Sequence, residues 1–160
     1  MAERRFADLP EAGSAALARA LAPELRPCDA VLLEGPLGGG KTHFARAIIQ
    51  TRLAAAGLFE EVPSPTYTLV QIYDDGIAEI WHSDLYRLSG PDDVIELGLD
   101  EALETAICLV EWPDRLGDMT PESALTLRFD ISRNGDARDL RATWNAQRWD
   151  EAIRGLAIDA

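Results

Sequence analysis

Residues 35–42 are Gly-Pro-Leu-Gly-Gly-Gly-Lys-Thr, which match the phosphate-binding pattern Gly-x-x-x-x-Gly-Lys-Ser/Thr. In such a loop the glycines let successive backbone N–H groups point at a phosphate. The ammonium group of Lys41 would bridge the β- and γ-phosphates, and the hydroxyl group of Thr42 would ligate magnesium. A glycine-rich turn without a ligand is the alternative, but a chance match has odds of roughly one in two hundred. The motif therefore predicts binding of ATP and magnesium.

The segments on either side of this loop fit the same prediction. Val31-Leu-Leu33 is a short apolar run, which predicts a buried strand. Residues 41–56 predict a helix, with Phe44 and Ile48 four positions apart and Gly57 at its end. A loop between a strand and a helix gains the positive end of that helix for binding phosphate.

A magnesium site in such a protein needs an acidic residue, typically at the end of a neighbouring buried strand. Glu111 fits best, because it directly follows the apolar residues 107–110. Asp84 is the rival, since a strand is also expected to end there. Either side chain could instead be a solvated acid at a strand end, and nearby His82 could be a half-buried histidine with a structural role.

Ser64-Pro-Thr-Tyr67 predicts, by itself, only a turn before a strand. In P-loop proteins, however, a loop carrying Ser or Thr between the first helix and the next strand senses the γ-phosphate. Ser64 and Thr66 are therefore candidates for that contact.

The rest of the chain alternates helices and strands. Helices are expected at 12–22, ended by Pro23; after an N-cap at Ser89; and around the stripe Trp149, Ile153 and Leu156. Further strands are expected at 67–73 and 77–82, joined by the turn Asp74-Asp75-Gly76, at 106–110, and at 125–131 and 138–144, joined by Asn134-Gly135. We therefore predict one P-loop NTPase domain over residues 1–160, an α/β fold of three layers with a mixed parallel and antiparallel sheet.

The composition, 47% hydrophobic and 27% charged, is that of a globular protein. A net charge of −13 argues against tight, unaided binding of RNA through a broad basic face, although the acidity could serve solubility alone. No apolar run approaches a membrane span or a signal peptide. Cys28 and Cys108 lie beside apolar runs and are expected to be buried thiols, as in a reducing cytosol. We expect a cytoplasmic protein.

Four segments together resemble one family. They are the loop and helix start at residues 35–44, Ser-Pro-Thr-Tyr-Thr-Leu-Val at 64–70, His-Ser-Asp-Leu-Tyr-Arg-Leu at 82–88, and Leu-Val-Glu-Trp-Pro at 109–113. In order and spacing they are similar to the bacterial TsaE (YjeE) ATPases of tRNA threonylcarbamoyladenosine biosynthesis. The resemblance runs from about residue 9 to about residue 140. The first motif is widespread, but its combination with the other three blocks is specific.

The resemblance implies an ATPase that is weak alone and works while docked on a two-subunit, TsaB/TsaD-like threonylcarbamoyl transferase, with tRNA contacted only indirectly or locally. It implies that Thr42 and Glu111 hold magnesium. It also implies that Asp84, Ser64 and Thr66 act around the γ-phosphate and the attacking water. A stretch that includes Glu11, and the turn at Gly135, would lie near the nucleoside. The residues expected to contact nucleotide are Glu11, Gly38, Gly39, Gly40, Lys41, Thr42, His43 and Gly135.

Two positions depart from the family pattern. Pro36 stands where Asp is common, which removes a carboxylate from the rim of the loop. His43 stands where a second Thr is common, which removes a hydroxyl group from the α-phosphate contact but leaves the backbone N–H. Neither change affects Lys41 or Thr42, so we expect nucleotide binding to survive.

Two other functions fit a P-loop domain of this size. One is a free-standing small-molecule kinase, which usually has an arginine-bearing lid over the phosphates. No arginine or lysine stands between Arg87 and Arg115, which disfavours the kinase. The other is a nucleotide-gated binding module with negligible turnover, because P-loop residues indicate binding better than rate.

Overall fold

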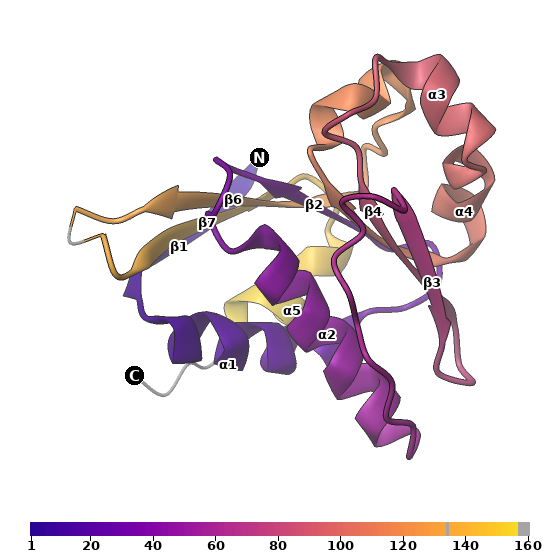
Figure 1. Ribbon diagram of the computed structural model, residues 1–160. Coiled ribbons are helices and arrows are strands. Elements are labelled where there is room, and N and C mark those ends of the chain that lie inside the picture. The colour runs from indigo at the N-terminus through magenta and orange to yellow at the C-terminus, as the bar shows by residue number, and fades with distance from the viewer. Residues whose placement is uncertain (134, 157–160) are drawn as a thin grey trace.

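The computed structural model describes residues 1–133 and 135–156, and within them seven strands form one sheet (Figure 1). The strand order is β1-β7-β6-β2-β5-β4-β3. The strands are β1 (Ala2–Leu9), β2 (Ala30–Glu34), β3 (Val70–Asp74), β4 (Glu79–Asp84), β5 (Ile107–Glu111), β6 (Leu125–Ile131) and β7 (Arg138–Trp144). β6, β2, β5 and β4 run parallel, whereas β1, β7 and β3 pair antiparallel with their neighbours. The predicted α/β fold with a mixed sheet is confirmed.

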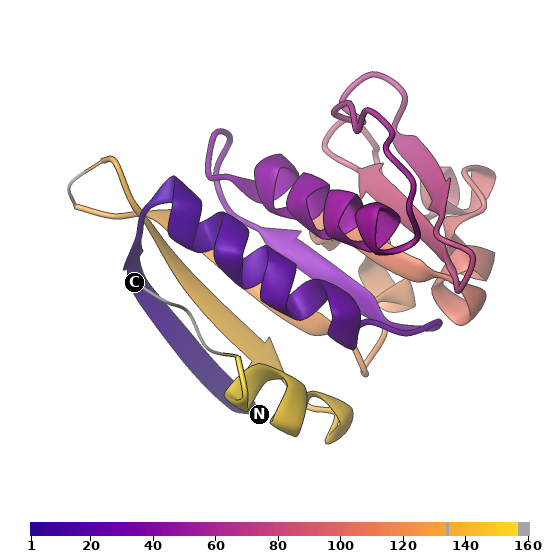
Figure 2. The same ribbon diagram turned by 90° about the horizontal axis from the view of Figure 1, so that it is seen from below.

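Helices cover the two faces of this sheet unequally. One face packs against α1 (Glu11–Leu21), α2 (Lys41–Ala55) and α5 (Arg148–Arg154), which Figure 2 shows from below. The other face is covered by α3 (Pro91–Glu96), α4 (Leu99–Thr105) and the short helix η2 (Pro113–Met119). That second cover lies over the β2-β5-β4 side only (Figure 1). No helix in the described part of the chain is long and apolar enough to cross a membrane.

The central strands are apolar because both of their faces are covered. β2 is Ala-Val-Leu-Leu-Glu and β5 is Ile-Cys-Leu-Val-Glu, and all residues but Glu34 are buried. Strands buried on both faces have near-continuous apolar runs. Their register sets Glu111 opposite Leu33 of β2 and Asp84 of β4. The polar residues that end these strands therefore gather at one edge of the sheet.

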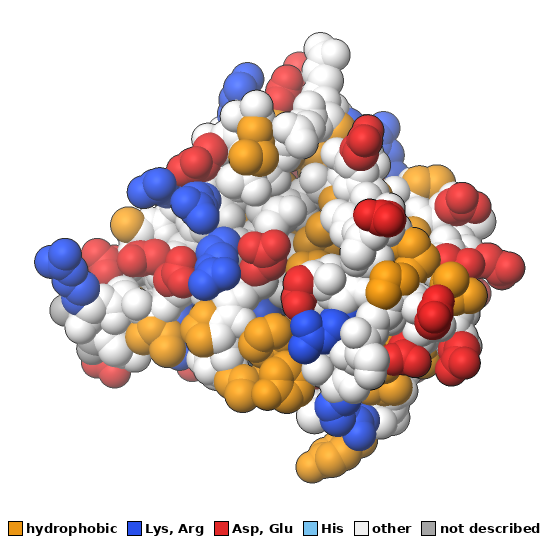
Figure 3. Space-filling view, turned by 90° about the horizontal axis from the view of Figure 1, so that it is seen from above, with side chains coloured by type: hydrophobic (Ala, Val, Ile, Leu, Met, Phe, Trp, Pro, Cys, Tyr) orange, Lys and Arg blue, Asp and Glu red, His pale blue; other side chains and the backbone are white. Residues whose placement is uncertain are grey.

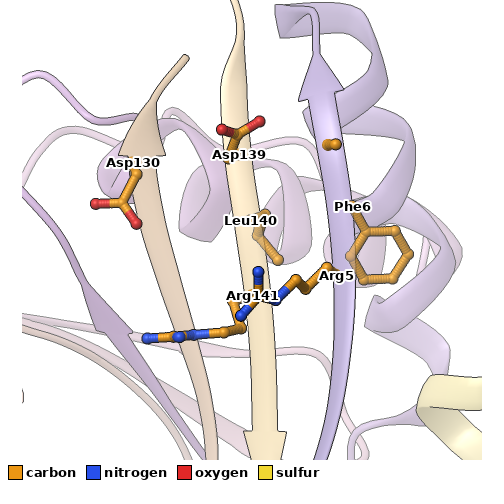
Figure 4. A pocket seen from close by; sticks show the side chains of 7 residues that line it. Arg5, Phe6, Asp130, Asp139, Leu140 and Arg141 are labelled. Carbon is orange, nitrogen blue, oxygen red and sulfur yellow. The ribbon is translucent and has the colours of Figure 1, made fainter. Parts of the chain in front are cut away.

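In the outer strands β1, β7 and β6, more buried and more exposed residues largely alternate, and one face of these strands is open to solvent (Figure 3). Arg5, Arg141 and Arg128 lie in register across this face. Glu3 lies 2.6 Å from Arg5, and Asp130 lies 3.3 Å from Arg128. Figure 4 shows the pocket on this face, where the Arg5 side chain reaches from β1 towards β7 and the Arg141 side chain extends from β7 towards β6. Acidic side chains intervene, so this face is not uniformly basic.

Several predicted helix boundaries were wrong. The α-helix α1 covers residues 11–21. Pro23 does not end the helical segment, because it lies inside the short 3-10 helix η1 (Ala22–Glu24) that follows α1. Proline fits there because the first turn of a helix needs no backbone N–H donor. Ser89 is not the N-cap of α3; that residue is Gly90, and Pro91 takes the first helical position. The carboxylate of Asp93 instead accepts a hydrogen bond from the N–H of Ser89 at 2.9 Å.

The strand predictions were better, with one strand omitted and some boundaries shifted. β6 and β7 match their predicted ranges, while β3 begins only at Val70 because Leu69 has a left-handed backbone and closes a turn onto Pro65. β4 is shifted to 79–84, and β1 and α4 were not predicted. Gly135 has a positive φ in the β6–β7 turn, but Asn134 lies outside the described residues. Cys108 is buried, whereas Cys28, in a left-handed conformation before β2, is exposed.

Candidate functional site

The P-loop joins β2 to α2, and two glycines permit its path. Gly35 has a φ of +139°, and a Cβ atom there would lie 2.3 Å from the carbonyl oxygen of Phe129. Gly40, with a φ of +100°, is the N-cap of α2. Left-handed values of this kind are costly for residues with a Cβ atom. The loop can therefore press against β6 and turn directly into the helix, whose first N–H groups lack partners within the helix.

Lys41 is folded back onto the loop that precedes it. Its ammonium nitrogen donates hydrogen bonds to the carbonyl oxygens of Gly35 at 2.6 Å and Pro36 at 2.8 Å. The ring of Trp112 lies over it, with 4.1 Å between Nζ and the ring centroid. Burial lowers the pKa of Lys41, an effect partly opposed by the charges of Glu111 and Asp84. A partly desolvated cation in this position attracts phosphate strongly.

A chain of hydrogen bonds links the first turn of α2 to the ends of two strands. Thr42 donates through Oγ1 to Glu111 Oε1 at 2.7 Å, and His82 Nε2 lies 2.7 Å from Glu111 Oε2. The side chains of His82 and Glu111 are 0% and 3% exposed. Both oxygens of the Glu111 carboxylate are thus held by named partners, which fixes its orientation.

Asp84 and the Ser64–Thr66 loop lie beside this chain. Asp84 is buried, and one of its oxygens accepts a hydrogen bond from the N–H of Tyr86 at 3.0 Å. The hydroxyl groups of Ser64 and Thr66 are 2.7 Å apart. Arg87 holds the loop, because its guanidinium donates to the carbonyl oxygens of Thr66 and Tyr67 at 2.8 and 2.9 Å.

One pocket of about 420 Å³ unites most of the predicted residues. Those that line it are Gly38, Gly39, Gly40, Lys41, Thr42, His43, Ser64, Thr66, Asp84 and Glu111. Glu11 lines a second, adjoining pocket that shares Gly40 and His43, and its carboxylate lies 3.8 Å from His43 Nε2. Gly135 lines neither pocket, but its carbonyl oxygen accepts a hydrogen bond from Arg138 at 3.4 Å.

The donor atoms in the main pocket fit magnesium. Mg²⁺ prefers oxygen ligands and is usually held by one or two carboxylates together with substrate phosphates. The Thr42 hydroxyl and the Glu111 and Asp84 carboxylates supply such atoms on one wall of the pocket. Within residues 1–133 and 135–156, no group of three His, Cys, Asp or Glu side chains could hold a metal ion by itself.

Sequence reasoning missed Arg138, which lines the second pocket and contacts the P-loop. Its guanidinium donates to the carbonyl oxygens of Gly38 and Gly39 at 3.0 and 3.2 Å. The only signal in the sequence was its position just after a predicted turn. Sequence reasoning also left the role of His82 open, and the structure shows that its side chain contacts Glu111.

Residues 10–140 match the family model described as threonylcarbamoyl adenosine biosynthesis protein TsaE. The chain belongs to the TsaE family. A Rickettsia felis relative, named tRNA threonylcarbamoyladenosine biosynthesis protein TsaE, is 43% identical over 115 residues, or 72% of this chain and 66% of the relative. The chain thus matches just under two thirds of that relative's length. A Bacillus subtilis relative of the same name is 36% identical over 122 residues, 76% of this chain and 72% of the relative.

A solved structure agrees with this TsaE assignment. The crystal structure of Bacillus subtilis YdiB aligns with a TM-score of 0.77 and 26% sequence identity, and the alignment covers 96% of this chain and 93% of that one. The likeness therefore includes β1, β7 and α5 as well as the P-loop half.

Proposed function

We propose that this TsaE-family chain binds and hydrolyses ATP in the formation of threonylcarbamoyladenosine on tRNA, at the adenosine beside the anticodon. It would act in the cytoplasm, with a two-subunit, TsaB/TsaD-like threonylcarbamoyl transferase. One observation supports the proposal most. Lys41, Thr42, Asp84 and Glu111, which come from three separate sequence blocks, line a single pocket.

In this proposal the P-loop N–H groups and Lys41 bind the phosphates of ATP. Thr42 and Glu111 would hold magnesium, which, when bound, neutralises charge on the phosphate oxygens. Asp84 lies on the same wall and would orient the attacking water by accepting a hydrogen bond from it. Ser64 and Thr66 would contact the γ-phosphate. Because Arg87 is exposed and hydrogen-bonded to this loop, it would move together with the loop at the protein surface. Glu11 and His43 would lie near the nucleoside, since they line the adjoining pocket.

Exposed apolar side chains near the phosphate pocket support a protein partner. Leu37 is 68% exposed, Tyr67 87% and Tyr86 48%. Tyr86 also packs against Trp112, with 4.9 Å between ring centroids. Exposed aromatic side chains of this kind are enriched in protein interfaces. A partner seated here would contact the Ser64–Thr66 loop directly and could respond to the γ-phosphate.

Steady-state ATPase assays test this function. We expect slow hydrolysis by the purified protein, stimulation by the two-subunit transferase, and tighter co-elution of the complex with ATP than with ADP. Lys41→Ala is the matched control and should abolish both stimulation and the nucleotide dependence of co-elution. Fast turnover by the protein alone, or phosphate transfer to a small metabolite, would instead support the kinase.

A further inference from the structure

Arg138 connects the start of β7 to the outer side of the P-loop. Besides the carbonyl oxygens of Gly38 and Gly39, its guanidinium donates to those of Ala137 at 3.0 Å and Gly135 at 3.4 Å. The side chain is half-buried. One cation thus joins the β6–β7 turn to a loop that lies about a hundred residues earlier in the chain.

These contacts determine which way the peptide units of the loop face. A peptide unit is planar and trans, so its carbonyl and N–H point in opposite directions. With the Gly39 carbonyl held on Arg138, the N–H of Gly40 faces the other way. That N–H forms no hydrogen bond with another described residue. Gly40 lines the phosphate pocket, and its backbone N–H is therefore available to donate a hydrogen bond to an anion bound there.

A second peptide unit continues the network to Lys41. The carbonyl of Gly38 is held on Arg138, and the N–H of the same unit, that of Gly39, donates to Pro36 O at 3.0 Å. Pro36 O also accepts a hydrogen bond from Lys41 Nζ. Hydrogen bonds arranged in a chain polarise one another. Lys41 therefore holds the start of the loop, at Gly35 and Pro36, and Arg138 holds its second half, at Gly38 and Gly39.

We propose that Arg138 is a positioning residue that shapes the P-loop for phosphate before nucleotide arrives. The inference rests on the proposed function, in which this loop binds the phosphates of ATP. Among the described residues, Arg138 donates only to backbone carbonyls, two of them in the P-loop, so it would act through the loop. Removal of the Arg138 side chain should free the 38–39 and 39–40 peptide units to rotate. It should therefore weaken the binding of every ligand that accepts a hydrogen bond from the Gly40 N–H.

The expected effect on nucleotide affinity differs from that of replacing Thr42 or Glu111, the residues proposed to hold magnesium. Arg138→Gln should lower the affinity for ATP and ADP by the same factor, roughly 10- to 100-fold, because two charge-assisted hydrogen bonds to the loop are lost. The factor should not depend on magnesium. Arg141→Gln is the matched control: Arg141 lies on the same strand, carries the same charge, and its side chain forms no hydrogen bond within the described residues. It should bind both nucleotides as the unchanged protein does.

Calorimetry with ATP and ADP, each with and without magnesium, measures these affinities. Amide hydrogen exchange of residues 35–42 in the nucleotide-free protein supplies a second readout, and it should be faster in Arg138→Gln than in Arg141→Gln. If Arg138→Gln fails to fold, Arg138→Lys replaces it; lysine keeps the charge but lacks the planar fork, so it should show the same losses in smaller degree.

Equal affinities and equal loop exchange in the Arg138 and Arg141 variants would overturn the proposal. A loss confined to magnesium-ATP would also overturn it. Absence of nucleotide binding by the unchanged protein would refute the proposed function, while faster loop exchange in the Arg138 variant would still support its role in shaping the loop.

Discussion

His82 Nε2 lies 2.7 Å from Glu111 Oε2, and the two side chains are 0% and 3% exposed. The other oxygen of Glu111 accepts a hydrogen bond from Thr42. A carboxylate held at both oxygens has one orientation, and groups that orient a metal ligand commonly govern metal affinity. His82 therefore belongs to the arrangement that would present Glu111 and Thr42 to magnesium.

Replacing His82 by Phe removes the hydrogen bond but fills similar space. We expect the magnesium concentration for half-maximal ATP binding to rise roughly 10- to 100-fold, because Glu111 loses its orienting partner. Magnesium titrations followed by calorimetry would measure this. Trp81→Phe, at the neighbouring position of β4, is the control and should leave the midpoint unchanged. An unchanged midpoint in His82→Phe would restrict His82 to packing.

Lys41 and Thr42 should separate phosphate binding from metal binding. Lys41→Ala should abolish ATP binding, because it removes the cation that reaches the β- and γ-phosphates. Thr42→Ala should weaken binding of magnesium-ATP more than binding of metal-free ATP, while Thr42→Ser, which keeps the hydroxyl group, should resemble the unchanged protein. Calorimetry with and without magnesium measures both. Equal losses in the two conditions would rule out a metal role for Thr42.

Glu111 and Asp84 should differ in the step they affect. Glu111→Ala should raise the magnesium requirement for both ATP binding and hydrolysis. Asp84→Ala should leave binding nearly intact and lower turnover, because Asp84 forms no hydrogen bond with Thr42 and could orient water in the pocket that both line. Parallel binding and single-turnover measurements distinguish them. The opposite pattern would mean that the two carboxylates exchange roles.

The Arg52–Asp75 ion pair should control stability in acid. Arg52 Nη2 lies 2.8 Å from Asp75 Oδ2, and the two side chains are 7% and 3% exposed. Burial alone would raise the pKa of Asp75, but hydrogen bonds from the N–H groups of Ala78 and Ile77, together with Arg52, outweigh it and lower the pKa. A lowered pKa contributes stability above the unfolded value, about pH 3.9, and that stability is lost as the pH falls through the folded value.

Asp75→Asn should therefore lower the free energy of unfolding at pH 7 by about 3–5 kcal/mol, since Arg52 is left buried without its charge partner. The difference from the unchanged protein should shrink below about pH 4. Urea unfolding at pH 7 and pH 3 provides the comparison. Asp74→Asn, in the same turn but exposed, serves as the control. A difference that stays constant across this range would argue against charge as the cause.

The P-loop pattern, the Ser64–Thr66 loop and the ends of two predicted strands located most of the pocket residues. Glu111 and Asp84 are the last residues of β5 and β4, and parallel strands bring their carboxyl ends to one edge of the sheet. The sequence favoured Glu111 over Asp84 as the magnesium ligand, but it could not show the hydrogen bond that joins Thr42 to Glu111. Nor could it find Arg138, because that contact arises from the position of β7 beyond β6, and no local pattern encodes it. β1 was not predicted, because the strand that it pairs with, β7, lies far away in the sequence.

The pairing of β1 with β7 has a consequence for synthesis on the ribosome. β1 emerges well before β7, but Ala2 pairs with Trp144, and Arg4 donates to the carbonyl oxygen of Ile153 in α5. At about 5–20 residues per second, β1 waits roughly 7 to 25 seconds for β7. The segments that form β2, α2, β4 and β5 emerge in that interval. The nucleotide-binding half can thus assemble on the nascent chain, while the charges of Arg4 and Arg5 discourage the unpaired strand from joining other chains.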